Sequence, residues 1–168
     1  MNNVAATHII RFILLLLVQV LICNNINFLG YVNPYVYIVF ILLFPIRDTR
    51  LTLLLVSFLL GMLVDMFSDS GGVHAAASVA LAYSRPVILK SSFGMLYEHQ
   101  SIKFSNTDIG NLITYVTLAT ILHHFILFAL EIFNISSVIL ILKKTLFSTI
   151  FTVIVSVLII ILFSRNRK

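Results

Sequence analysis

The sequence predicts an all-α integral membrane protein, a bundle of six transmembrane helices with both termini in the cytoplasm. Hydrophobic residues make up 60% of the 168-residue chain and charged residues only 10%, whereas soluble proteins average roughly 45–50% and a quarter. Apolar stretches recur at lengths near the roughly 20 residues that cross a bilayer as a helix. The basic residues gather in alternate loops, a bias that sets orientation in membranes. The composition therefore excludes a soluble domain and a disordered chain.

The first two spans are expected at about residues 9–28 and 34–46. The apolar run before Cys23 resembles a signal peptide, but no small-x-small cleavage pattern follows it, so we expect an uncleaved helix. The second stretch is short, with Pro34 near its start and Pro45 near its end, where a helix tolerates proline. A single cysteine excludes an internal disulfide and a cysteine-based zinc cluster.

Four further spans complete the predicted bundle, which forms one domain over the whole chain. They are expected at about residues 51–68, 73–89, 111–133 and 146–163. The fourth is rich in alanine and less apolar than the others. The longest polar stretch, 90–110, separates the fourth span from the fifth and would be a cytoplasmic loop.

Charge distribution supports this count. Nine of the eleven basic residues would share the cytoplasmic side with both termini. They are Arg11, Arg47, Arg50, Arg85, Lys90, Lys103, Arg165, Arg167 and Lys168. The exceptions, Lys143 and Lys144, precede the sixth span, where lysines can reach back to the interface. Segment 134–144 is expected to be an interfacial helix or an extension of the fifth span. No basic stripe with interleaved aromatics indicates nucleic-acid binding.

Ionisable groups inside the spans are the first candidates for function, because each costs about 2.5–3.5 kcal/mol near a helix centre. Asp65 is the clearest, and four-residue spacing places it on one helical face with Ser57, Gly61 and Asp69. A matching stripe of small residues on the fourth span comprises Ala76, Ala80 and Ser84. Small residues let helices approach closely. The row is therefore either a close helix seam or part of a partner-binding surface.

The other candidates lie in and beside the fourth and fifth spans. Gly72 is expected in a turn that reverses the chain at the outer face, and glycine suits such a turn because it accepts positive φ. His74 opens the helix that follows. Arg85 with Pro86 indicates mainly an interface anchor and a kink, and secondarily a contact with lipid headgroups. The adjacent His123 and His124 point about 100° apart on a helix, so they are poorly spaced to chelate one metal ion.

Depth along the helices predicts which of these groups meet. Asp65 and His124 each lie about 20 Å from the cytoplasmic start of their helices. We therefore expect Asp65 and the His123–His124 pair to share one polar site, with Ser78 as a competing partner of Asp65. No nucleophile–base pair or metal motif accompanies these residues, so neither an enzyme nor a cofactor is predicted.

Several strings along the chain carry a family resemblance. The central ones are residues 61–69, 72–78 and 85–86, which include Gly61, Asp65, Asp69, Gly72, His74, Ser78, Arg85 and Pro86. They resemble the central motif of the rod shape-determining protein MreD family. Gln19, Asn24, residues 31–35 and the run from His123 through His124 to Glu131 resemble the version found in Bacteroidetes-type bacteria. Together these strings cover nearly the whole chain.

The resemblance implies a non-enzymatic component of the bacterial inner membrane that works in cell elongation and peptidoglycan synthesis. Members of the family associate with MreC and, through it, with the MreB filament, RodA and a penicillin-binding transpeptidase. Their six-helix fold is similar to that of the substrate-binding subunits of energy-coupling-factor vitamin transporters, so a small-molecule transporter subunit is the alternative. Those subunits usually carry Ala-x-x-x-Ala on their first helix, and residues 9–28 contain no alanine. The missing alanine motif does not exclude binding of a lipid or a small ligand inside the bundle.

Overall fold

The computed structural model describes residues 2–28, 32–46, 49–98 and 107–165, and this part of the chain is built from helices without a β-strand. Four of the described helices are long and apolar enough to cross a membrane, so the chain is a multi-pass membrane protein. They are α1 (Asn2–Leu21), α3 (Arg50–Ser68), α6 (Ile109–Ile132) and α7 (Val138–Arg165). Short helical segments add η1 (Cys23–Asn25), α5 (Met95–Glu98) and η2 (Ile135–Ser137).

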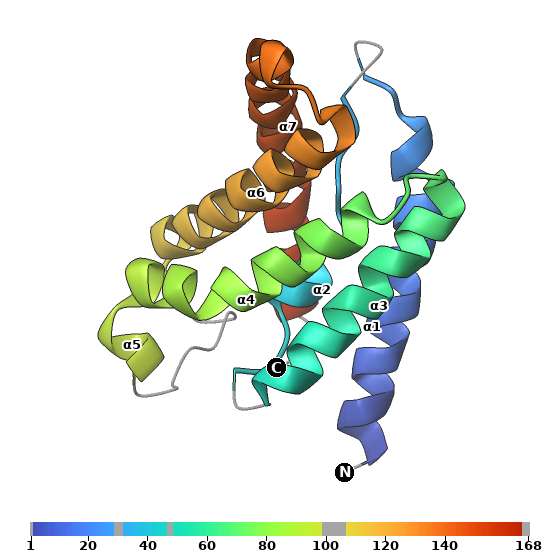
Figure 1. The fold of residues 1–168 in the computed structure, drawn as a ribbon. Coiled ribbons are helices and arrows are strands. Elements are labelled where there is room, and N and C mark those ends of the chain that lie inside the picture. Colours follow the sequence, from blue (N-terminus) through green and yellow to red (C-terminus); the bar gives the residue numbers. More distant parts are fainter. Residues whose placement is uncertain (1, 29–31, 47–48, 99–106, 166–168) are drawn as a thin grey trace.

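A fifth long helix, α4 (Val73–Phe93), occupies the middle of the bundle. It packs against α3 on one side and α6 on the other, α7 packs against α6, and α1 lies along α3 (Figure 1). Residues 69–72 turn the chain between α3 and α4, and we call this end of the bundle the turn end. In Figure 1 the turn end lies above the start of α1 and the end of α7. The helix continues through Pro86 and ends at Phe93, beyond the expected Leu89.

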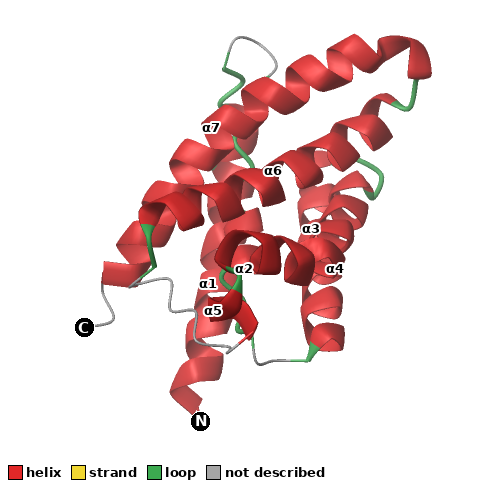
Figure 2. Cartoon of the chain, turned by 90° about the vertical axis from the view of Figure 1, so that its left-hand side faces the viewer, coloured by secondary structure: helices red, strands yellow, loops and turns green. Residues whose placement is uncertain are grey.

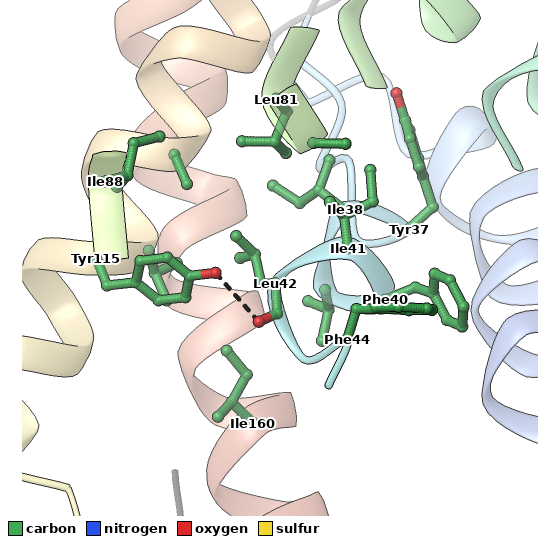
Figure 3. Packing of buried hydrophobic residues seen from close by; sticks show 14 of the residues in the cluster. Tyr37, Ile38, Phe40, Ile41, Leu42, Phe44, Leu81, Ile88, Tyr115 and Ile160 are labelled. Atoms are coloured by element: carbon green, nitrogen blue, oxygen red, sulfur yellow. Dashed lines mark hydrogen bonds between the residues drawn. The ribbon is translucent and has the colours of Figure 1, made fainter. Parts of the chain in front are cut away.

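The second expected span differs from the prediction. Only residues Ile38–Leu42 of the described stretch 32–46 form an α-helix, α2, and every side chain in it is at most 3% exposed. Figure 3 places this short helix among Leu81 of α4, Tyr115 of α6 and Ile160 of α7. Non-helical backbone at membrane depth is tolerated where protein covers it. An apolar stretch that is too short to span as a helix is therefore enclosed by the bundle.

Side chains from other helices satisfy the backbone that precedes α2. Gln19 of α1 donates from Nε2 to the carbonyl of Pro34 at 3.2 Å and accepts from the amide of Tyr37 at 3.4 Å. The hydroxyl of Thr152 on α7 accepts from the amide of Tyr35 at 3.0 Å. Because an unpaired backbone group in hydrocarbon costs several kcal/mol, these polar residues are needed wherever the chain is not helical.

The last helix also differs from the prediction. α7 begins at Val138 rather than near residue 146. Residues 138–144 therefore belong to α7, and are neither a separate interfacial helix nor an extension of α6, which ends at Ile132 (Figure 2). Among the basic residues used for the orientation, Arg47, Lys103, Arg167 and Lys168 lie outside the described residues, as do positions 99–106 of the expected loop.

Candidate functional site

Asp65 joins α3 to the first turn of α4. Its Oδ1 accepts hydrogen bonds from the Ser70 hydroxyl at 2.5 Å and the His74 amide at 3.0 Å, and its Oδ2 accepts from the Ala75 amide at 2.8 Å. The first amides of a helix have no partner within the helix, and a carboxylate is favourable beside them. Gly72 precedes this turn with φ of 95°, a conformation that glycine adopts readily. Asp65 therefore caps α4 from a neighbouring helix.

Gly61 marks the closest approach of α3 to α4. A Cβ atom built on Gly61 would lie 2.5 Å from Cα of Ala75 and 2.6 Å from the carbonyl oxygen of His74. The structure thus contains the expected close seam on the Gly61 side. Its partner on α4 is the His74–Ala75 backbone and not the predicted stripe, because Ala76 is exposed and Ala80 is only half-buried.

We expect Asp65→Asn to destabilise the fold by about 1–3 kcal/mol. Two backbone amides and one hydroxyl donate to the two oxygens of the carboxylate, whereas the asparagine side chain has a single acceptor oxygen. Thermal unfolding of the purified chain in detergent measures the loss. Asp69→Asn is the matched control, because the Asp69 carboxylate is exposed and has no hydrogen bond or ion pair with the described residues. A loss of stability equal in both variants would contradict the capping role.

A chain of hydrogen bonds runs from α4 through the α2 segment to α6. The Tyr37 hydroxyl lies 3.0 Å from Nδ1 of His74 and 2.7 Å from Nε2 of His123. His74 is 6% exposed, and both Tyr37 and His123 are completely buried. The link connects three elements through side chains that are far apart in sequence.

The neighbouring His124 turns to a different helix. Its Nδ1 lies 3.1 Å from the Thr149 hydroxyl of α7, and its Nε2 has no partner among the described residues. The Tyr35 ring packs against both sides of this cluster, with centroid distances of 5.6 Å to His74 and 5.1 Å to His124. As expected from their spacing, the adjacent histidines of α6 diverge. The described residues contain no group of three or more His, Cys, Asp or Glu side chains placed to hold a metal ion.

The expected pairing of Asp65 with the α6 histidines is wrong in its contacts. Asp65 binds the turn and the backbone of α4, whereas His123 and His124 bind Tyr37 and Thr149. α4 stands between α3 and α6 (Figure 1), so equal depth did not bring the groups together. Ser78, the expected competitor, is fully buried on α4 and makes no hydrogen bond with Asp65.

Arg85 is not an interface anchor. Its side chain is 3% exposed, and its Nη2 donates to the carbonyls of Leu42, at 3.1 Å, and Phe44. Its Nε donates to the Tyr115 hydroxyl at 3.0 Å. Figure 3 shows the second bond of that hydroxyl, which donates to the same Leu42 carbonyl at 3.1 Å. The guanidinium and the phenol together satisfy the backbone at the end of α2, which would otherwise lack partners.

Besides Asp65, two further acidic groups stand at the turn end. Glu131, near the end of α6, forms a salt bridge with Lys144 of α7 at 2.9 Å, and the Lys144 ammonium lies 5.3 Å from the centroid of the Phe128 ring. Lys144 was expected on the outer side, where basic residues are few. The salt bridge gives it an acidic partner there. Asp69 ends α3 with φ of 49°.

Two hollows adjoin these residues. A groove of about 900 Å³ runs along the outer face of α3 and α4. A polar cavity of about 520 Å³ lies at the turn end, between the ends of α1, α3 and α6 and the start of α4. Both Asp69 and Glu131 line the cavity, together with His74.

Four residues of this arrangement were missed by sequence reasoning as site residues: Tyr35, Tyr37, Tyr115 and Thr149. A tyrosine in an otherwise apolar span was the available signal, since a buried phenol needs a partner. The partners themselves come from other helices and follow only from the fold.

The chain matches no protein-family model, no curated protein and no solved structure. Its fold and its polar clusters define a multi-pass helical membrane protein whose interior holds a buried histidine–tyrosine network.

Proposed function

We propose that the chain is a non-enzymatic component of the bacterial cell-elongation machinery in the inner membrane, similar to the MreD family. It would assemble with an MreC-like protein and, through it, with the MreB filament, RodA and a penicillin-binding transpeptidase. The support from the sequence is the string of residues from Gly61 to Pro86. In the structure these residues make one unit, the α3–turn–α4 hairpin with its Asp65 cap and Gly61 contact.

The observation that carries the proposal is the groove on the outer face of this hairpin. Small residues Gly72, Ala76 and Ala80 recur every fourth position along α4 in its floor. Phe58 and Tyr83, 40% and 76% exposed, line it as well. Small residues allow close backbone approach, which supplies much of the attraction between helices in lipid. A single transmembrane helix of the MreC-like partner would lie in this groove.

The proposed orientation keeps both termini in the cytoplasm, with six passages of the chain. The second passage is the α2 segment rather than a spanning helix. In support, the Arg11 guanidinium of α1 lies 5.4 Å from the ring centroid of Phe163, which is near the end of α7. The start of the chain and its end thus share one side of the bundle, opposite the turn end.

Filling the groove should weaken partner recovery. We expect Ala76→Leu, which adds a branched side chain to the groove floor, to lower co-purification of a tagged MreC-like protein about tenfold, equivalent to about 1.4 kcal/mol. Replacing the native copy by this variant in the host should give rounded cells.

Val87→Leu is the matched control, because Val87 lies on the same helix, is 72% exposed and does not line the groove. It should leave partner recovery and cell shape unchanged. Undiminished recovery with Ala76→Leu would refute the groove as the docking surface, and normal cell shape after depletion of the whole protein would refute the proposed function.

A further inference from the structure

The polar cavity at the turn end has features that partner binding on the groove does not use. Its lining includes the polar residues Asn24, Asn25, Asn33, Tyr35, Ser68 and Ser70. A volume of about 520 Å³ falls in the range of small-molecule sites, roughly 300–1,000 Å³. Helices α1, α3 and α6 end beside it, so the proposed orientation would place the cavity near the lipid headgroups.

The charged groups of this wall favour a cation. The Asp69 carboxylate has no hydrogen bond or ion pair with the described residues, so its charge is available to a ligand. Glu131 also lines the cavity, and only its Oε1 is bonded to Lys144. Two carboxylates and one ammonium leave this corner with a net negative charge, which a primary ammonium group would balance.

His74 adds a second and independent pointer to a ligand. It is 6% exposed and lines the cavity, and its Nδ1 is bonded to Tyr37 while its Nε2 has no partner among the described residues. Nδ1 of His123 is buried without a partner, and a buried N–H without a partner is rarer than a bare acceptor. The shared proton of His123 is therefore assigned to Nε2, which donates to the Tyr37 oxygen.

That assignment determines what His74 offers to the cavity. Tyr37 has one proton, which it then donates to Nδ1 of His74. The proton of the neutral His74 ring consequently sits on Nε2, the ring nitrogen without a partner among the described residues, and His74 is one of the residues that line the cavity. The cavity thus combines carboxylates for a cation with an N–H group for an anionic oxygen.

We propose that the cavity binds a small zwitterion with a primary ammonium group and a phosphate, the chemistry of ethanolamine phosphate. The ammonium lies between Asp69 and Glu131, and a phosphate oxygen accepts from Nε2 of His74. This chemistry has two sources, the headgroup of phosphatidylethanolamine and a free compound in solution. This proposal does not depend on the MreC-like partner, because the groove proposed for that partner and the cavity are separate hollows.

Calorimetric titration of the purified full chain in dodecyl maltoside tests the site. The probes are ethanolamine phosphate and choline phosphate, each as the free compound and as the headgroup of a dihexanoyl phospholipid. Because the trimethylated ammonium of choline cannot donate hydrogen bonds, we expect the ethanolamine forms to bind about tenfold more tightly. Binding of the lipid alone would identify the membrane as the source, and binding of the free compound would show that the headgroup chemistry suffices.

The decisive variant is Asp69→Asn, which keeps the side-chain shape, and asparagine tolerates the positive φ of this position. It should weaken ethanolamine phosphate binding about tenfold. Asp108→Asn is the control, because Asp108 caps the other end of α6 and asparagine caps equally well; its affinity should equal that of the unmodified chain. The proposal is overturned if no probe binds, if choline and ethanolamine forms bind equally, or if Asp69→Asn binds as tightly as Asp108→Asn.

Discussion

Gly61→Leu is expected to abolish the folded protein, and even Gly61→Ala should cost about 3 kcal/mol or more. The added Cβ would meet the Ala75 backbone at 2.5 Å, and backbone within two packed helices cannot move aside as a flexible side chain does. Separating α3 from α4 would also break the bond from the Ala75 amide to Asp65. Alanine is intrinsically a better helix former than glycine by about 1 kcal/mol, so the expected effect is opposite in sign to propensity.

Unfolding by sodium dodecyl sulfate, followed by circular dichroism in mixed micelles, measures this difference. Leu59→Ala is the reference, because Leu59 lies on the same helix and is 52% exposed; its effect should stay within about 0.5 kcal/mol. A Gly61→Ala protein as stable as Leu59→Ala would show that the two helices do not touch at this position.

The long helices could be predicted from the sequence because length and apolar composition decide whether a segment can span a bilayer. Residues 51–68 and 111–133 were expected, and α3 and α6 agree to within two residues at each end. Residues 34–46 could not be resolved by the same criterion. An enclosed irregular segment and a short span are equally apolar, and only the bundle around the segment distinguishes them.

The candidate site was likewise predictable only in part. Asp65, His123 and His124 were expected inside the bundle, since the cost of burying a polar group requires a reason, and all three are buried. Arg85 was expected at the interface and is buried as well. The partners of these residues were not predictable. The sequence gives the depth of a residue along its helix, but not the order of the helices around the bundle, and both are needed to place two side chains together. Arg85 illustrates this: its acceptors lie on a segment that the sequence presented as a helix with its own hydrogen bonds satisfied.

Several buried polar side chains in the bundle serve its backbone. Asp65 caps α4, while Gln19 and Arg85 satisfy the α2 segment. Side chains committed to such bonds are poor candidates for ligand contact. The Asp69 carboxylate and Nε2 of His74 have no hydrogen-bond partner among the described residues. Both residues line the same cavity, which is why the ligand site is proposed there.

Arg85→Met is expected to destabilise the protein by about 2–4 kcal/mol, because the Phe44 carbonyl then loses its donor inside the bundle and Tyr115 loses a donated hydrogen bond. Tyr115→Phe should cost about 1 kcal/mol, since Arg85 still donates to the Leu42 carbonyl. In each single variant the Leu42 carbonyl keeps one of its two donors. In the double variant it has no donor among the described residues, so the combined loss should exceed the sum of the single losses by about 1 kcal/mol or more.

The measurement is a double-mutant cycle on the unfolding free energy in mixed micelles, with Tyr83→Phe as the reference for loss of an exposed hydroxyl. Tyr83 is 76% exposed on the same helix as Arg85, so its effect should be near zero. Strictly additive losses would contradict the shared role, because they would mean that the Leu42 carbonyl does not depend jointly on the guanidinium and the phenol. A non-additive loss would instead identify the end of α2 as the place where α4 and α6 jointly hold the non-helical segment inside the membrane.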